Sequence, residues 1–401
     1  MNKIKKILNY IDSHKLYPDI KIINGSVKAN VFIDEKKVLM FSSNNYIGIA
    51  THPRVVNAAV NATKKYGVGS GGSRMLSGNL RIHRDFEFAI AKFKGYEDAI
   101  VWPSGYSANV GIISALINPL KVGVSDFFER KGVIFSDELN HASIIDGCQM
   151  SKQKIVIYRH NNVGDLEKKL KKYKKRRELV VTDSVFSMDG DIAPLDKIAK
   201  LCKKYDAMLM IDEAHATGVL GDKGHGAVEY FNLDPSKDVD VIMGTCSKAL
   251  GVTGGFVVGS KSLIRYLRVA SRSYIFSTAM TPASSAALIE ALKVIEDEPE
   301  IREKMWKNVK YLRESFNKIG FDTITSETQI IPVLIGKEEK AIEFARKLLA
   351  KGIFAPCVRW PAVRKNKARI RFTVMSEHTK EQIDYLLQCC CDIGKDLNII
   401  K

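Results

Sequence analysis

The sequence predicts an α/β fold that has a mostly parallel sheet and a smaller α+β unit toward its C-terminal end. Short, nearly all-apolar segments alternate with amphipathic helical segments through the central part of the chain. Strands that helices cover on both faces have this composition, and their alternation with helices is typical of a parallel sheet. A length of 401 residues is enough for two or three structural units.

Residues 1–50 are expected to form an N-terminal segment, with a short amphipathic helix followed by a small β element around Ala29–Met40. Residues 51–282 are expected to form the large α/β domain, in which helices such as Leu195–Tyr205 connect the strands. Its predicted strands are Ala99–Trp102, Gly132–Phe135, Lys154–Tyr158, Glu178–Thr182, Ala207–Ile211, Val239–Met243 and Gly255–Val258.

The pattern changes after about Pro282, where a long helical stretch, Ala283–Ile319, begins. Residues 283–401 are therefore predicted to form a smaller C-terminal α+β domain. Its later elements are the strand Gln329–Ile335, the helix Lys340–Lys351, the strand Lys367–Val374 and a last helix from Lys380.

The composition is that of a folded protein, with 45% apolar and 27% charged residues. Lys plus Arg is 62 and Asp plus Glu is 45, so the formal charge is +17. The densest basic run, Lys168–Arg177, also carries Leu170 and Tyr173 at helical spacing, which predicts the solvated face of an amphipathic helix. We therefore expect no nucleic-acid partner, although a basic surface suits polyanionic small molecules.

The cysteine and hydropathy patterns narrow the class of protein further. The seven cysteines show no CxxC pair and no Cys/His spacing typical of zinc, so no metal is expected. Reduced thiols predict a cytoplasmic protein. The first residues lack the continuous apolar stretch of a signal peptide. No apolar run reaches the roughly 20 residues that a membrane span needs.

Polar side chains follow several of the predicted strands. Ligands of open α/β sheets bind beyond the carboxyl ends of the strands, so these side chains predict a site there. The segments concerned are Ser136–His141, Asp183–Gly190, Asp212–His215 and Gly244–Lys248.

Two of these residues suggest a particular chemistry. Lys248 ends an apolar strand, where partial desolvation would lower its pKa and allow Schiff-base chemistry; the alternative is a surface lysine at a strand end. Asp212 follows four apolar residues, so a buried carboxylate is expected there, and it needs a cationic partner such as a pyridinium nitrogen or an arginine. His215 is close enough in sequence to bind the same ligand.

A phosphate site is also predicted. The strand Ala99–Trp102 is followed by a turn and a helix from Tyr106, and N–H groups at a helix start bind phosphate. The glycine-rich Gly67–Arg74 segment instead follows a predicted helix, Val55–Tyr66. It therefore does not meet the dinucleotide-binding pattern, and no nicotinamide cofactor is expected.

A set of motifs, in order along nearly the whole chain, resembles the α-oxoamine synthases. These are pyridoxal-phosphate (PLP) enzymes of the aspartate-aminotransferase fold (fold type I). The motifs are SNNYIGI (Ser43–Ile49), GSGGSR (Gly69–Arg74), SGYSAN (Ser104–Asn109), DELNHASIIDG (Asp137–Gly147), VFSMDGDIAPL (Val185–Leu195), DEAHATGVLG (Asp212–Gly221) and TCSKALG (Thr245–Gly251).

The resemblance implies roles for residues at the strand ends. Lys248 would be the lysine that binds the cofactor covalently, and Asp212 would pair with the pyridinium nitrogen. His215 and Ser187 would bind near the phenolic oxygen. His141 would stack on the ring face and could later donate a proton.

The same resemblance implies further cofactor contacts and a homodimer. Gly105, Tyr106 and Thr245 would contact the phosphate or the cofactor. Ser277 and Thr278 match positions that reach the cofactor phosphate of the other subunit, so the active sites would lie at the interface of a homodimer.

Substrate contacts are implied in the same way. Arg371 would clamp the carboxylate of the amino acid, with Arg369 on the same strand face. Asn45 matches a position near the substrate. The implied reaction is the decarboxylative condensation of a small amino acid with an acyl-CoA or acyl-carrier-protein thioester, which gives an α-amino ketone.

The motifs GSGGSR and VRWPAV (Val358–Val363) make the condensation of L-alanine with a pimeloyl thioester, a step of biotin biosynthesis, the first expectation. Glycine with acetyl-CoA and serine with a long-chain thioester are the alternatives. A PLP aminotransferase on the same fold is a more distant one. A nucleic-acid-binding protein is suggested by charge alone.

Overall fold

The computed structural model describes residues 2–13, 17, 20–118, 132–173 and 177–401. Its center is a seven-stranded sheet of order β4-β10-β9-β8-β7-β5-β6. The antiparallel β10 pairs with β4 and β9, and the other neighboring strands pair in parallel. The strands are β4 (Asp98–Trp102), β5 (Gly132–Asp137), β6 (Lys154–Tyr158), β7 (Arg177–Asp183), β8 (Met208–Asp212), β9 (Val241–Thr245) and β10 (Gly255–Gly259).

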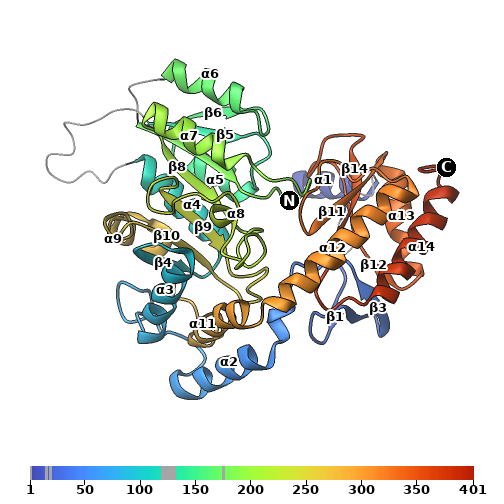
Figure 1. The fold of residues 1–401 in the computed structure, drawn as a ribbon, viewed down its shortest axis with the longest axis horizontal. Helices are drawn as coiled ribbons and strands as arrows, with labels where there is room; N and C mark the ends of the chain where they lie inside the picture. Colours follow the sequence, from blue (N-terminus) through green and yellow to red (C-terminus); the bar gives the residue numbers. More distant parts are fainter. Residues whose placement is uncertain (1, 14–16, 18–19, 119–131, 174–176) are drawn as a thin grey trace.

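The predicted mostly parallel sheet is therefore confirmed, and each predicted strand is found within two residues of its expected start. Helices cover both faces of this sheet (Figure 1). In chain order the helices are α1 (Asn2–Ser13), α2 (Pro53–Tyr66), α3 (Arg81–Lys94), α4 (Gly105–Ile117), α5 (Ala142–Met150), α6 (Val163–Tyr173), α7 (Leu195–Tyr205), α8 (Ala227–Tyr230), α9 (Lys261–Ala270), α10 (Arg272–Ile275), α11 (Pro282–Asp297), α12 (Pro299–Ile319), α13 (Glu338–Ala350) and α14 (Lys380–Asp396), with a 3₁₀ turn at Ile49–Thr51.

Alternate side chains of each strand belong to two different cores. Leu179 and Val181 of β7 pack with the apolar faces of α4 and α9. Val180, between them, faces the opposite side and packs with α6 and α7. This burial on both faces explains why the strand segments are almost wholly apolar, since successive side chains of a strand point to opposite faces.

The expected single helical stretch Ala283–Ile319 is wrong in one respect, because the structure contains two helices there. Glu298 separates α11 from α12 and has non-helical backbone angles, φ −125° and ψ 60°. Pro299 disfavors the helical conformation in the residue before it, while it fits well at the first position of a new helix. The break therefore lies where the proline requires it.

The C-terminal elements form a second layer beside the large sheet. β11 (Ile330–Gly336), β14 (Ala368–Thr373) and β13 (Cys357–Val358) make a three-stranded antiparallel sheet. Figure 1 shows α12 leading from α11 toward these strands and toward α13 and α14.

The N-terminal strands belong spatially with this C-terminal layer. β1 (Ile23–Asn24), β2 (Asn30–Ile33) and β3 (Lys36–Met40) form a four-stranded sheet with β12 (Ile353–Phe354), which pairs in parallel with β3. Figure 1 shows the blue N-terminal strands beside the red C-terminal elements. The predicted small β element is thus present, and chain segments more than 300 residues apart share one sheet.

The basic run Lys168–Arg177 lies on α6 as far as Tyr173, as predicted. Leu166 and Leu170 of this helix are buried, while its lysines face outward. Residues 174–176 of that run lie outside the described part of the chain. Among the described residues, no helix is both long enough and apolar enough to cross a membrane.

Candidate active site

A cavity of about 300 Å³ lies at the carboxyl ends of the parallel strands. It brings together residues from five segments that are far apart in sequence. Those predicted from the sequence that line it are Gly105, Tyr106, His141, Ser187, Asp212, His215, Thr245 and Lys248. The strand-end site expected from the sheet topology is therefore present as a cavity.

Asp212 is the buried carboxylate of this cavity, with 2% of its surface exposed. Its Oδ2 accepts a 2.8 Å hydrogen bond from Asn109 Nδ2, and its Oδ1 accepts one of 2.8 Å from the Ala214 N–H. Burial raises the pKa of Asp212, and the positive charge of Lys248 opposes that rise. A cation bound in the cavity would oppose it further.

Lys248 follows β9 and is half-buried at the cavity wall. Burial lowers the pKa of its amine, while Asp212 and Asp183 raise it. A lysine with a lowered pKa has a larger neutral fraction, which is the nucleophilic form.

His141 is the N-cap residue of α5, and hydrogen bonds of its backbone and ring fix its position. Its N–H donates a 2.7 Å hydrogen bond to Asp183 Oδ2, and its Nδ1 lies 2.7 Å from Ser143 Oγ. Burial lowers the pKa of His141, and Asp212 opposes this. Burial also raises the pKa of Asp183 well above its usual range, and the charge of Asp212 adds to the rise.

His215 links the cavity to the C-terminal layer. Its Nδ1 lies 2.7 Å from the Tyr46 hydroxyl, which donates to Asn44 Oδ1 at 2.9 Å. Arg371 Nη2 donates to the same Asn44 oxygen at 3.3 Å, and Arg371 Nε donates to the Ser187 carbonyl. Burial lowers the pKa of His215 well below its usual value, so the ring is neutral.

The start of α4 lines one wall of the cavity. Ser104 caps the helix by accepting a hydrogen bond from the Ser107 N–H. A Cβ on Gly105 would approach Thr245 Cβ to 3.0 Å. Gly105 and Thr245 therefore pack closely at this wall of the cavity, and N–H groups at a helix start can bind phosphate.

Four of the predicted site residues do not line this cavity. Arg371 reaches its rim through Ser187. Asn45 lies elsewhere, because its Nδ2 donates to the Val27 carbonyl and its Oδ1 accepts from the Ala50 N–H. Ser277 and Thr278 lie on an outer segment, where Thr278 pairs with Ser73.

The structure places in or near the cavity three residues to which the sequence assigned no individual role, although Asp183 begins one of the predicted strand-end segments. Asn109 and Asp183 line the cavity, and Asn44, rather than its neighbor Asn45, contacts Arg371. The sequence could have predicted Asn109, because this residue lies one helical turn after Gly105 and therefore on the same face of the expected helix. Nothing in the pattern distinguishes Asn44 from Asn45, since that segment has no helical or strand period.

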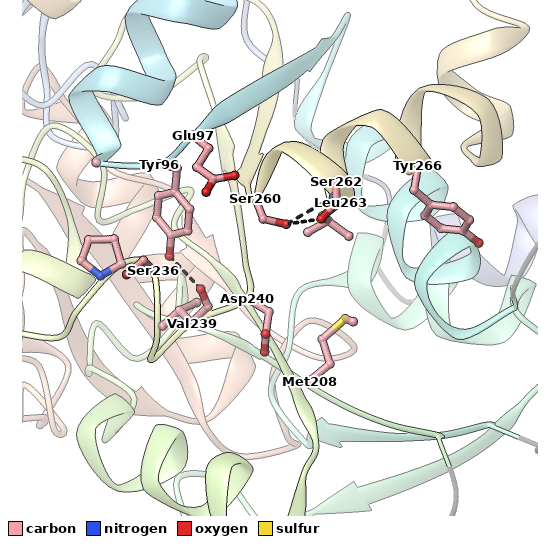
Figure 2. Close-up of a pocket in the computed structure, with 12 residues that line it drawn as sticks. Tyr96, Glu97, Met208, Ser236, Val239, Asp240, Ser260, Ser262, Leu263 and Tyr266 are labelled. Carbon is pink, nitrogen blue, oxygen red and sulfur yellow. Dashed lines mark hydrogen bonds between the residues drawn. The ribbon is translucent and has the colours of Figure 1, made fainter.

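A second cavity, of about 440 Å³, lies at the opposite ends of the strands (Figure 2). Its lining includes Met208, the first residue of β8, and Asp240, just before β9. Tyr96 donates a hydrogen bond to the Val239 carbonyl there. No lysine, arginine or histidine is among the described residues that line it, so it lacks the groups that the smaller cavity brings together.

Comparisons with known proteins agree with this geometry. The family model described as aminotransferase class I and II matches residues 36–389. The 8-amino-7-oxononanoate synthase of Thermoanaerobacter pseudethanolicus is 45% identical, and the alignment covers 99% of this chain and 98% of that protein. The 8-amino-7-oxononanoate synthase 1 of Bacillus subtilis is 42% identical, with coverage of 99% and 98%.

A solved structure gives the same result in three dimensions. It is a variant of serine palmitoyltransferase from S. paucimobilis with a bound PLP–myriocin aldimine, 33% identical to this chain. The superposition has a TM-score of 0.91 and covers 100% of this chain and 98% of that one. With a family model that matches most of its length and relatives above 40% identity, this chain belongs to the aminotransferase class I and II family.

Proposed function

We propose that this protein catalyzes the 8-amino-7-oxononanoate synthase reaction with PLP as its cofactor. In this reaction L-alanine and a pimeloyl thioester give 8-amino-7-oxononanoate, carbon dioxide and the free thiol. The observation that carries the proposal is the cavity that joins Lys248, Asp212 and the start of α4, in a chain whose full-length relatives bear that name.

The donor set of the cavity fits PLP. A half-buried amine, a buried carboxylate and a helix N-terminus match the aldehyde, the ring nitrogen and the phosphate of the cofactor. Asn109 Oδ1 is buried and has no hydrogen-bond partner among the described residues, which is consistent with a ligand in contact with that wall. When bound, PLP supplies an electron sink for a carbanion next to the amino group.

The residues of the chain supply charge, orientation and proton transfer. Asp212 stabilizes a positive charge at the position that faces it, and Asn109 and the Ala214 N–H fix the direction of its carboxylate. Lys248, with its lowered pKa, can accept a proton as a neutral amine. Arg371 is oriented by Asn44 and by the Ser187 carbonyl, and its guanidinium is suited to a substrate carboxylate.

Serine with a long-chain thioester is the second candidate, because the solved structure reported above is a serine palmitoyltransferase. Glycine with acetyl-CoA is a third. Either donor, acyl-CoA or acyl carrier protein, is a polyanion that suits a chain of formal charge +17.

The test offers carboxyl-labeled alanine, glycine and serine with short, pimeloyl and long-chain thioesters of both carriers. We expect thiol and labeled carbon dioxide to be released together, and fastest with alanine and a pimeloyl thioester. Release with glycine and acetyl-CoA alone would refute this assignment. Formation of a keto acid without thiol release would indicate an aminotransferase instead.

We also propose that the protein is a homodimer, in which Ser277 and Thr278 serve the cavity of the other subunit. Both lie on an outer segment that is bonded to the 72–73 turn. Val68, Leu76 and Phe276, on these two neighboring segments, are each more than 70% exposed. Exposed apolar side chains on neighboring segments support a protein–protein contact there.

A further inference from the structure

His160 lies between two buried carboxylates just after β6. Its Nδ1 is 3.0 Å from Asp137 Oδ1, and its Nε2 is 2.7 Å from Asp191 Oδ2. The two aspartates are 2% and 6% exposed. Because a carboxylate only accepts, both ring nitrogens must carry hydrogen, and the ring is an imidazolium.

The electrostatics agree with this geometry. Burial alone would lower the pKa of His160, but its hydrogen bonds to Asp137 and Asp191 outweigh burial and raise the pKa to about 10. The ring also meets Phe186 edge to face, with centroids 4.4 Å apart. The imidazolium is therefore held on three sides.

The first carboxylate begins the turn that carries a cavity residue. Asp137 ends β5, and its Oδ1 also accepts a 2.9 Å hydrogen bond from the Leu139 N–H. The turn continues through Asn140, which donates to the Val181 carbonyl, and ends at His141. The position of Asp137 thus helps to set where His141 enters the cavity.

The second carboxylate ends the loop that carries Ser187, residues 186–191. The Phe186 N–H donates to the Asp191 carbonyl, which closes the loop on itself. Asn161 Nδ2 also donates to Asp191 Oδ2, at 2.8 Å. The segment 160–161 is therefore one attachment of this loop to the large sheet, beside the bridge between Val185 and Ile192 at the base of the loop.

The other side of this loop contacts the C-terminal layer. Arg369 Nη1 donates to Asp189 Oδ1 at 2.6 Å and to the Met188 carbonyl at 3.1 Å. Arg371 donates to the Ser187 carbonyl, and Thr328 donates to the Gly190 carbonyl at 2.8 Å. The loop is thus one of the connections between the large sheet and the strand that bears Arg371.

We propose that His160 is a positioning residue: its imidazolium joins the turn that carries His141 to the loop that carries Ser187, and so fixes the place where Arg371 meets the amino-acid carboxylate. The inference rests on the proposed function, because it takes Arg371 as the carboxylate-binding group. His160 lines no part of the cavity among the residues described there, so it acts through these neighbors.

The test compares His160→Gln with His225→Gln. Glutamine removes the positive charge of the ring and replaces its two nitrogens, which lie on opposite sides, by a single amide nitrogen. His225 is a close match, since it is also half-buried and meets a phenylalanine edge to face, Phe93 at 4.6 Å. PLP-loaded protein is titrated with L-alanine, glycine and L-serine, and the change in cofactor absorbance is followed without any thioester.

We expect His160→Gln to weaken amino-acid binding about tenfold, as the loss of a charged hydrogen bond does. His225→Gln should leave binding unchanged. In protein without cofactor, the amides of residues 186–191 should exchange hydrogen faster in His160→Gln than in the wild type.

The outcomes separate the two proposals. If the wild type shows no absorbance change with any amino acid, the proposed function is wrong. If the wild type responds, and His160→Gln binds equally well with unchanged exchange in the loop, the positioning role is wrong. A lower melting temperature with unchanged binding would identify a structural role alone.

Discussion

Asn109 Nδ2 donates a buried 2.8 Å hydrogen bond to Asp212 Oδ2. Asn109 is itself fully buried, and its Nδ2 also donates to Ser143 Oγ at 2.9 Å. The direction of the cavity carboxylate is therefore set by α4, whose first residues also line the cavity. Under the proposed function, one helix would orient both ends of the cofactor.

Asn109→Ala should lower kcat/KM about tenfold, because Asp212 loses a buried hydrogen bond. The control is Asn118→Ala, at the C-terminal end of the same helix, where Nδ2 donates to the Ser151 carbonyl instead. Steady-state kinetics of both variants give the comparison. Equal losses in the two variants would show that Asn109 supports the helix and not the carboxylate.

Asp212→Asn should reduce turnover by about a hundredfold or more, since it keeps the shape and a polar group but removes the charge that faces the cavity. Circular dichroism and melting should stay close to those of the wild type, because asparagine keeps a hydrogen-bonding oxygen. Turnover near that of the wild type would rule out an electrostatic role for Asp212.

Lys248 should be the site at which PLP attaches. Borohydride reduction of PLP-loaded protein followed by peptide mapping should place the label on Lys248, because its amine lines the cavity and burial lowers its pKa. Lys248→Ala should abolish turnover, whereas Lys261→Ala, at the exposed start of α9, should not. A label on another lysine, or protein that stays colorless with added PLP, would contradict the assignment.

The site residues that could be predicted from the sequence are those at the ends of the regular strands. Asp212 is the last residue of β8, and His141 and Lys248 lie four and three residues after β5 and β9; parallel strands bring their carboxyl ends to one edge. His160 also follows a strand, but no pattern indicates that Asp137 and Asp191 lie on both sides of its ring, because those contacts depend on how loops fold.

Two other features could not be predicted because they depend on irregular or interrupted structure. Asn44 and Asn45 lie in an irregular segment, where a single residue decides which side chain faces Arg371. The break between α11 and α12 was present in the sequence as Pro299 but was hidden by continuous helical periodicity. The division into domains at residues 50 and 282, and the roles taken from the family resemblance, stay predictions.

Replacing Ser277 and Thr278 together with alanine should weaken PLP retention while leaving folding nearly unchanged. The reason is that both lie on an outer segment away from the cavity of their own chain, so their effect would come through the second subunit. PLP loss on dialysis and light scattering measure the two properties, with Ser262→Ala on the surface of α9 as control. An active monomer would contradict the interface model.

The last prediction concerns stability and Glu178, which lies near the start of β7. It is 4% exposed, and neither carboxylate oxygen has a hydrogen-bond partner among the described residues. Burial, with a smaller effect from Asp206, raises its pKa to about 7. In the unfolded chain a glutamate ionizes near pH ~4.3. Between these two values the folded protein keeps a proton that the unfolded chain has released.

The free energy of unfolding should therefore fall as pH rises from about 4.3 to about 7, and this loss should then remain at higher pH. Glu178→Gln removes the ionization, so it should raise the melting temperature above that of the wild type by about 1–3 °C at pH ~8. At pH ~4 the gain should vanish, because Glu178 is then protonated in both states. Thermal melts across pH, with the exposed Glu314→Gln as control, measure this difference. An equal gain at both pH values would show that better packing, rather than relief of a buried charge, stabilizes the variant.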